Sequence, residues 1–318
     1  MDALRQRTRR IFAPGRGILG LDTAAATLAT RFRDVALVPT RPTTDAYRAM
    51  VLDTPDLAAT TSCVVLGPDD VADSHRVVPL LEAGILVGVR ADTGCESLTG
   101  HDHDLVTSGL DGLAARLVRM RELGVTTAVW SVCAAATATT GSLRALTANS
   151  HAAARFAYTC QRLGIVPILR VGTRTTGASH ARRRAVVGAA LLSVCVALDE
   201  LDVDIAATVI SPSHEIDGLE HPPQSALALL PPQLGGVALA GGPSDAIAAV
   251  CAARPPWPVT FYLGQEATLP ALRAWRGQAA SVRAGQRALH AGLAVASHAL
   301  APPPHRAHRP HLTAVAHS

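Results

Sequence analysis

The chain has 318 residues, of which 48% are hydrophobic and 17% are charged, and its formal net charge is +4. This apolar content is enough for one large buried core and is too high for an intrinsically disordered chain. Aromatic residues make up only 3% and the basic residues are scattered, which argues against a nucleic-acid-binding surface.

The sequence contains no lysine, because all 29 of its basic Lys and Arg positions are arginine. Abundant Ala, Arg and Pro indicate a biased coding composition, which can replace lysine by arginine at surface positions. The densest basic run is residues 182–184. We interpret it as the solvated face of a helix rather than as a polyanion site.

The six cysteines contain no C-x-x-C pair, and Cys195 is one of several that lie in apolar runs. We interpret them as free thiols buried in a reducing cytoplasm. No segment approaches the roughly 18 uninterrupted apolar residues of a transmembrane helix, and no apolar segment follows the basic N-terminus. The sequence therefore predicts a cytoplasmic protein with neither nucleic acid nor membrane as a partner.

Short apolar runs follow one another along the chain and predict strands that are buried on both faces. They are residues 17–22, 62–67, 86–92, 126–132, 166–172, 205–211, 236–242 and 258–264. Segments with helical periodicity separate most of them, as in 110–124, 142–164 and 180–202, and Gly124 and Gly164 are predicted to end two of these helices. This alternation predicts an α/β fold with a single (β/α)8 TIM barrel; the alternative is a doubly wound open sheet.

The chain divides into a basic N-terminal extension at 1–10, the barrel at 11–300 and a Pro- and His-rich tail at 301–318 that we expect to be disordered. Two His-containing segments are alternatives for binding a divalent metal: the tail, with His305, His308 and His311, and the sequence HDHD at 101–104, in the loop after the third strand. We favour solvated segments in both places, so no metal site is predicted.

The carboxyl ends of the strands meet at one face of such a barrel, where the chemistry is carried out. In chain order, the segments IFAPGRGILGLD, GVRADTG, GLDGLAAR, ARFAYTCQRLGIVPI, ISP, AGG, PWPVTFYLG and ALRAW resemble the class I fructose-1,6-bisphosphate aldolases. The resemblance runs from about residue 11 to about residue 300. It implies a glycolytic lyase that needs no cofactor, is typically a homotetramer, and cleaves fructose 1,6-bisphosphate to dihydroxyacetone phosphate and glyceraldehyde 3-phosphate.

The resemblance also shows which catalytic positions have changed. The family's Schiff-base lysine closes the sixth strand, and here that position is Ser211, whose hydroxyl cannot form an iminium. The family's lysine and arginine on the fourth strand are Val129 and Ser131. Its two glutamates on the fifth strand, which supply the general acid and base, are Arg170 and Gly172, and arginine cannot accept a proton near neutral pH.

Other matched positions are retained or conservatively changed. Asp22 matches a first-strand aspartate that orients the nucleophile and handles protons; the alternative is a carboxylate that caps the next helix. Asp92 also matches, whereas Ala240 replaces a phosphate-contacting serine. The positions that match substrate- or phosphate-binding residues are Thr27, Arg31, Arg90 (in place of a lysine), Gly241, Gly242, Gly264 and Gln265 (in place of an arginine).

These changes predict an aldolase homologue whose lyase reaction is impaired or lost, a pseudoenzyme that keeps affinity for a phosphosugar or another anion. One alternative is an active lyase with a different, metal-assisted mechanism that uses the HDHD segment. The other is a structural subunit of a homo- or hetero-tetramer that contains an active aldolase.

Overall fold

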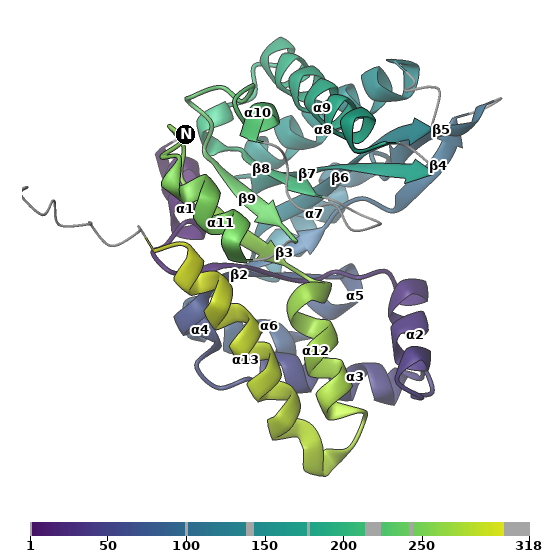
Figure 1. The fold of residues 1–318 in the computed structure, drawn as a ribbon, viewed down its shortest axis with the longest axis vertical. Helices are drawn as coiled ribbons and strands as arrows, with labels where there is room; N and C mark the ends of the chain where they lie inside the picture. Colours follow the sequence, from purple (N-terminus) through teal and green to yellow (C-terminus); the bar gives the residue numbers. More distant parts are fainter. Residues whose placement is uncertain are drawn as a thin grey trace, which may run out of the picture.

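The computed structural model describes residues 2–98, 101–137, 143–176, 179–213, 224–241 and 244–301. Its main feature is a closed barrel of parallel strands in the order β1-β10-β9-β8-β7-β6-β3-β2 (Figure 1). The prediction of a (β/α)8 barrel is therefore confirmed, and the open sheet is wrong. The barrel strands are β1 (Gly17–Leu21), β2 (Thr61–Leu66), β3 (Leu86–Arg90), β6 (Val125–Thr137), β7 (Val166–Thr176), β8 (Val209–Ser213), β9 (Gly236–Ala240) and β10 (Val259–Leu263).

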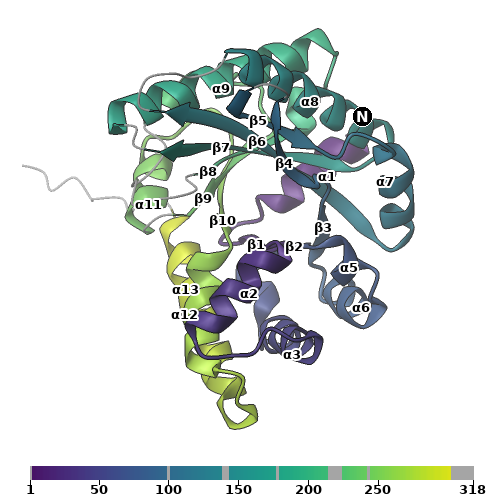
Figure 2. The ribbon, with the colours of Figure 1, turned by 90° about the vertical axis from the view of Figure 1, so that its right-hand side faces the viewer.

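Helices surround the barrel, and most of them connect one strand to the next (Figure 2). The predicted helix ends at Gly124 and Gly164 are confirmed, since both glycines have a positive φ directly after a helical turn. The helices are α1 (Asp2–Ile11), α2 (Ala25–Asp34), α3 (Arg41–Leu52), α4 (Leu57–Thr60), α5 (Pro68–Val71), α6 (Ser74–Glu82), α7 (Leu113–Glu122), α8 (Leu143–Arg162), α9 (His180–Glu200), the 3₁₀ turn η1 (Ile205–Ala207), α10 (Gln224–Leu227), α11 (Ser244–Ala252), α12 (Gln265–Trp275), the 3₁₀ turn η2 (Ala279–Ser281) and α13 (Val282–Ala299).

The strand residues alternate between two apolar clusters. One cluster fills the barrel interior and includes Ile18, Val65 and Ile168; the other lies between the barrel and the helices and includes Leu19, Val64 and Leu169. This double burial explains why the strands are continuous apolar runs. Helix α1 contributes its buried residues to the interior cluster and so closes the end of the barrel opposite the strands' carboxyl ends.

Three strands, β6, β7 and β8, have a boundary that differs clearly from the prediction. The sixth barrel strand was expected at 205–211, but Asp204 accepts a hydrogen bond from the Ala206 N–H at 3.1 Å and caps the turn η1, so β8 begins only at Val209. Strands β6 and β7 continue beyond their expected ends and stay paired up to Thr137 and Thr176. Their extensions project beyond the barrel on the side where β1 leads to α2 (Figure 1).

The segment after β3 forms an antiparallel hairpin of β4 (Gly94–Leu98) and β5 (His101–Ser108). A disulfide joins Cys95 on β4 to Cys133 on β6, so the prediction of free thiols is wrong for this pair. The two residues lie 38 positions apart, and only the folding of the hairpin against β6 brings them together. The other four cysteines are free, and burial raises the pKa of Cys63 to about 12.

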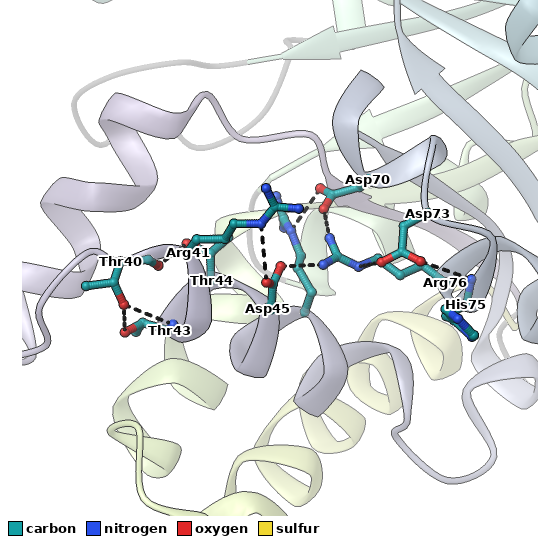
Figure 3. A network of polar contacts seen from close by, with 10 residues as sticks. Thr40, Arg41, Thr43, Thr44, Asp45, Asp70, Asp73, His75 and Arg76 are labelled. Carbon is teal, nitrogen blue, oxygen red and sulfur yellow. Dashed lines mark hydrogen bonds and ion pairs between the residues drawn. The ribbon is translucent and has the colours of Figure 1, made fainter.

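Helices α3, α5 and α6 are joined by ion pairs among Arg41, Arg48, Arg76, Asp45, Asp70 and Asp73, which we call the lateral ion-pair network (Figure 3). Buried Arg48 lies with its Nε 3.0 Å from Oδ2 of buried Asp70. Arg76 contacts three carboxylates, those of Asp45, Asp70 and Asp73. Every arginine of the network therefore has a carboxylate partner.

Within the described parts of the chain, no helix is long and apolar enough to cross a membrane. Of the predicted tail, residues 302–318 lie outside the described residues, and so do the side chains of residues 101–103, 183 and 184.

Candidate functional site

The carboxyl ends of the barrel strands surround a cavity of about 520 Å³, which we call the mouth cavity. Six ionisable side chains that could carry charge line it, together with the hydroxyl of Tyr262 and backbone from the ends of β1, β9 and β10. The predicted site residues that the structure brings together there are Asp22, Thr27, Arg31, Arg90, Ser131, Arg170, Gly241, Gly264 and Gln265, with Asp92 and Ala240 beside them. The mouth of a (β/α)8 barrel is where such folds place their chemistry.

Asp22 is the centre of the polar contacts in the cavity. Its Oδ2 lies 3.3 Å from Nη1 of Arg170, and its Oδ1 accepts a hydrogen bond from the Tyr262 hydroxyl at 3.4 Å. Its backbone carbonyl accepts a hydrogen bond from Nη1 of Arg90 at 2.9 Å. Asp22 does not cap α2, whose N-cap is Ala24 and has no side-chain hydrogen bond. The helix-capping alternative is therefore wrong, and Asp22 faces the cavity.

Tyr262 is a site residue that the sequence analysis missed. Burial raises its pKa well above the ordinary value, and the negative charge of Asp22 acts in the same direction. The phenol therefore stays protonated at neutral pH and donates to Asp22. The Arg170 guanidinium lies over its ring, 5.1 Å from the centroid, which is a cation–π contact. The alternation within β10 was the available signal, because Phe261 belongs to the outer cluster and Tyr262 to the inner one.

Asp92 supplies a second carboxyl group to the cavity. It is 6% exposed, and its Oδ2 accepts a hydrogen bond from the Ser131 N–H at 3.0 Å. Burial raises the pKa of Asp92, although the hydrogen bond from Ser131 and the charge of Arg90 oppose that shift. Asp92 therefore holds its proton to a higher pH than an ordinary aspartate does.

The two positions that the resemblance matches to the Schiff-base lysine and to the fourth-strand lysine carry no ionisable side chain. Ser211 is the register partner of Arg170 and is fully buried, and its Oγ has no hydrogen-bond partner in the described structure. Val129 is fully buried in the interior cluster, whereas Trp130 points outward and stacks on Phe156 with 5.3 Å between ring centroids. Ser211 and Val129 thus lie inside the barrel, below the lining of the mouth cavity.

The remaining predictions concern Gly172, Gly242 and the metal-binding alternative. Gly172 lies on β7, opposite Cys133 and Ser213, and does not line the mouth cavity. Gly242 lies outside the described residues. Among the residues that the structure describes, no group of three or more His, Cys, Asp or Glu side chains could hold a metal ion. Side chains 101–103 of the HDHD segment are not among them.

The ends of β9 and β10 and the first turn of α12 form the remaining side of the cavity. Gly241 has a φ of +64°, which favours glycine, and Gly264 is the N-cap of α12. Oε2 of Glu266 accepts a hydrogen bond from the Gly264 N–H at 3.0 Å. Arg31 donates through Nη2 to Oε1 of Gln265 at 2.8 Å. In (β/α)8 barrels, the seventh and eighth strand ends and a helix N-terminus are a frequent place for a phosphate.

Comparisons with known proteins give one consistent result. Residues 3–302 match the family model of the glycolytic fructose-bisphosphate aldolase class-I. The chain is 32% identical to a probable fructose-bisphosphate aldolase class 1 of Xylella fastidiosa, over 86% of this chain and 90% of that protein. It is 31% identical to a fructose-bisphosphate aldolase of Drosophila melanogaster, over 91% and 87%. The fold matches that of fructose-bisphosphate aldolase from Plasmodium falciparum, solved with TRAP and a small-molecule inhibitor, with a TM-score of 0.85, 24% identity and 94% of each chain covered.

Proposed function

Because the chain belongs to the class I fructose-bisphosphate aldolase family, we propose that it is a homologue that binds a phosphosugar or a related anion and in which aldol cleavage is impaired or lost. The observation that carries the proposal is Ser211, a buried serine at the position of the Schiff-base lysine, in a sequence without lysine. A hydroxyl group cannot form the iminium that serves as the electron sink for carbon–carbon cleavage.

The proton chemistry supports the same proposal. The two glutamate positions of the fifth strand are Arg170 and Gly172, and neither side chain can act as a general base at neutral pH. At the carboxyl ends of β1 and β3, the described carboxyl groups that line the mouth cavity are those of Asp22 and Asp92. Asp22 is already engaged by Arg170 and Tyr262, so it is held in place rather than free to shuttle protons.

Anion binding is supported by two cations whose described contacts are with neutral groups. Arg31 donates to the Gln265 side chain and to the Thr23 hydroxyl, and Arg90 donates to a backbone carbonyl. Among the described residues, neither forms an ion pair with a carboxylate within 4.0 Å, the limit for such pairs. No described carboxylate therefore neutralises either guanidinium group by an ion pair, and both can interact with an anionic ligand in the mouth cavity.

The decisive experiment is an aldol-cleavage assay on the purified protein, run with added divalent metal and with a chelator, beside an active family member. We expect no cleavage of fructose 1,6-bisphosphate in either condition. Borohydride reduction in the presence of dihydroxyacetone phosphate should leave the protein mass unchanged. Calorimetry should still detect binding of a sugar phosphate. Cleavage that the chelator abolishes would instead establish a metal-assisted lyase.

We further propose a tetramer, either of this chain alone or mixed with an active aldolase, and a cytoplasmic location. The four free cysteines support a reducing compartment, whereas the Cys95–Cys133 disulfide argues against one. Co-purification from cells with a tagged copy tests the assembly. Rapid alkylation of thiols at lysis, followed by mass spectrometry, tests the location, and a pair that is fully oxidised in cells would contradict it.

A further inference from the structure

We propose that Glu266 restricts the mouth cavity to ligands with a single anionic group, which is held at Arg90, and with an uncharged, hydroxyl-rich end beside α12. This inference rests on the proposed anion binding and names its ligand class: a sugar monophosphate in preference to a sugar bisphosphate. It concerns a residue that the comparison with the family pattern did not single out.

The Glu266 carboxylate lies in the first turn of α12. Helix α12 has 11 residues, and the N–H groups of its first turn attract anions. Oε2 of Glu266 accepts from the Gly264 N–H at 3.0 Å, and Oε1 lies 3.0 Å from the place that a Cβ on Gly241 would occupy. The carboxylate therefore spans the ends of β9 and β10. It occupies one of the N–H donors that an incoming phosphate at this end of the cavity could use.

Glu266 forms no ion pair within the described structure. Arg31 donates to the amide oxygen of Gln265, the residue before Glu266. A phosphate that entered beside α12 would meet this like charge as well as the cation of Arg31, and the repulsion would offset what Arg31 and the helix N-terminus contribute. Glu266 is exposed, so solvent screens part of this effect.

The opposite side of the mouth cavity can hold an anion. Arg90 ends β3, which is separated from β10 by β1 and β2 in the barrel. Its Nη1 donates to the backbone of Asp22, and its Nε is buried without a hydrogen-bond partner among the described residues. Arg170, in contrast, is engaged by Asp22 and by the ring of Tyr262. Arg90 is therefore the cation best placed to bind one phosphate.

The charge balance of the lining agrees with a single anionic group. The arginines that line the cavity are Arg31, Arg90 and Arg170, and the carboxylic acids are Asp22, Asp92 and Glu266. When all are ionised, these charges cancel. One phosphate at Arg90 can be accommodated locally, but a second phosphate on the far side would face the carboxylate of Glu266.

The test is calorimetric titration with fructose 6-phosphate and fructose 1,6-bisphosphate, which differ by one phosphate. The proteins are the wild type, Glu266→Gln, Glu266→Ala and the control Glu122→Gln, which removes the same charge from an exposed position on α7. We expect the wild type and the control to bind the bisphosphate no more tightly than the monophosphate. Both Glu266 variants should gain affinity for the bisphosphate, by about tenfold for Glu266→Ala, with less than a threefold change for the monophosphate.

The outcomes separate this inference from the proposed function. A wild type that binds the bisphosphate tenfold more tightly than the monophosphate overturns the inference and leaves anion binding intact. An unchanged ratio in both Glu266 variants also overturns it. A wild type that binds neither sugar phosphate overturns the proposed function, and the inference with it.

Discussion

The lateral ion-pair network and the mouth cavity each combine three arginines with three carboxylic acids, but they use them differently. In the network, every arginine lies against at least one carboxylate (Figure 3). In the mouth cavity, Arg170–Asp22 is the ion pair found among the described residues, and Arg31 and Arg90 donate to neutral oxygens. Paired charges hold helices together, whereas cations with neutral partners remain available to a ligand.

Cavity size does not distinguish the two regions. A cavity of about 500 Å³ adjoins the network and is lined in part by Asp45, Asp73 and Arg76, and the mouth cavity is about 520 Å³. The two cavities differ in whether the charged residues that line them are already paired. In the cavity beside the network, Asp45, Asp73 and Arg76 already have charged partners, and the cavity is away from the strands' carboxyl ends. Among the described residues, the mouth cavity combines two arginines whose hydrogen-bond partners are neutral with the end of the barrel where ligands bind.

The largest expected effect is on stability and comes from breaking the network. Asp70→Asn removes the carboxylate that contacts both Arg48 and Arg76 and leaves a buried guanidinium without its counter-charge. We expect the free energy of unfolding to fall by about 3–5 kcal/mol. Urea denaturation at pH 7 measures it. Asp69→Asn, an exposed neighbour on α5, should change stability by less than about 0.5 kcal/mol. Equal effects of the two variants would show that the network does not stabilise the fold.

The next largest effect is on ligand binding in the mouth cavity. Arg90→Met should weaken sugar-phosphate binding by about 1.5–3 kcal/mol, or roughly 10- to 100-fold in Kd, because a charge-assisted hydrogen bond is lost. The loss should be similar for fructose 6-phosphate and fructose 1,6-bisphosphate. Arg119→Met, which removes an exposed charge from α7, is the matched control and should leave calorimetric Kd values unchanged. Unaltered binding by Arg90→Met would remove Arg90 from the site.

A smaller effect concerns the pH dependence of stability at Asp92. Its folded-state pKa is raised by burial, so its protonated form favours the fold. That contribution is present below the unfolded pKa of about 3.9 and is lost as the pH rises through the raised value. Asp92→Asn cannot ionise, so the melting temperature of the variant relative to that of the wild type should rise as the pH increases from about 4 to the raised pKa and stay constant above it. A difference that grows toward acid pH would contradict burial as the dominant cause.

The smallest expected effect is that of restoring the nucleophile alone. Ser211→Lys should produce no measurable cleavage of fructose 1,6-bisphosphate, because Arg170, Gly172 and Val129 supply neither a general base nor a second amine. The variant for comparison carries seven substitutions: lysine at 129 and 211, arginine at 131 and 265, glutamate at 170 and 172, and serine at 240. These substitutions are the smallest set that we expect to give activity. A coupled dehydrogenase assay measures both. Cleavage by Ser211→Lys near the rates of active relatives would show that the fifth-strand carboxylates are dispensable.

The sequence alone determined the barrel and most of the cavity lining. The apolar runs repeat because each strand is covered on both faces, and this depends on residue type and spacing. Asp22, Arg90 and Arg170 could be assigned to one cavity because the carboxyl ends of parallel strands meet at one face. The proposed loss of the Schiff-base lysine rests on Ser211 and on the position that the resemblance gives it in the family pattern.

Only the tertiary structure decided which of these groups are partners. The start of β8 depends on the cap at Asp204, and the Cys95–Cys133 disulfide depends on how a hairpin folds against β6. The contact of Glu266 with Gly264 is local in sequence. The closed barrel also brings the Glu266 carboxylate beside Gly241, at the end of the neighbouring strand β9. Local patterns set periodicity and burial, whereas pairing between distant residues follows from strand register and barrel closure. The closed barrel therefore decides which arginines of the mouth cavity are paired with carboxylates and which can bind an anionic ligand.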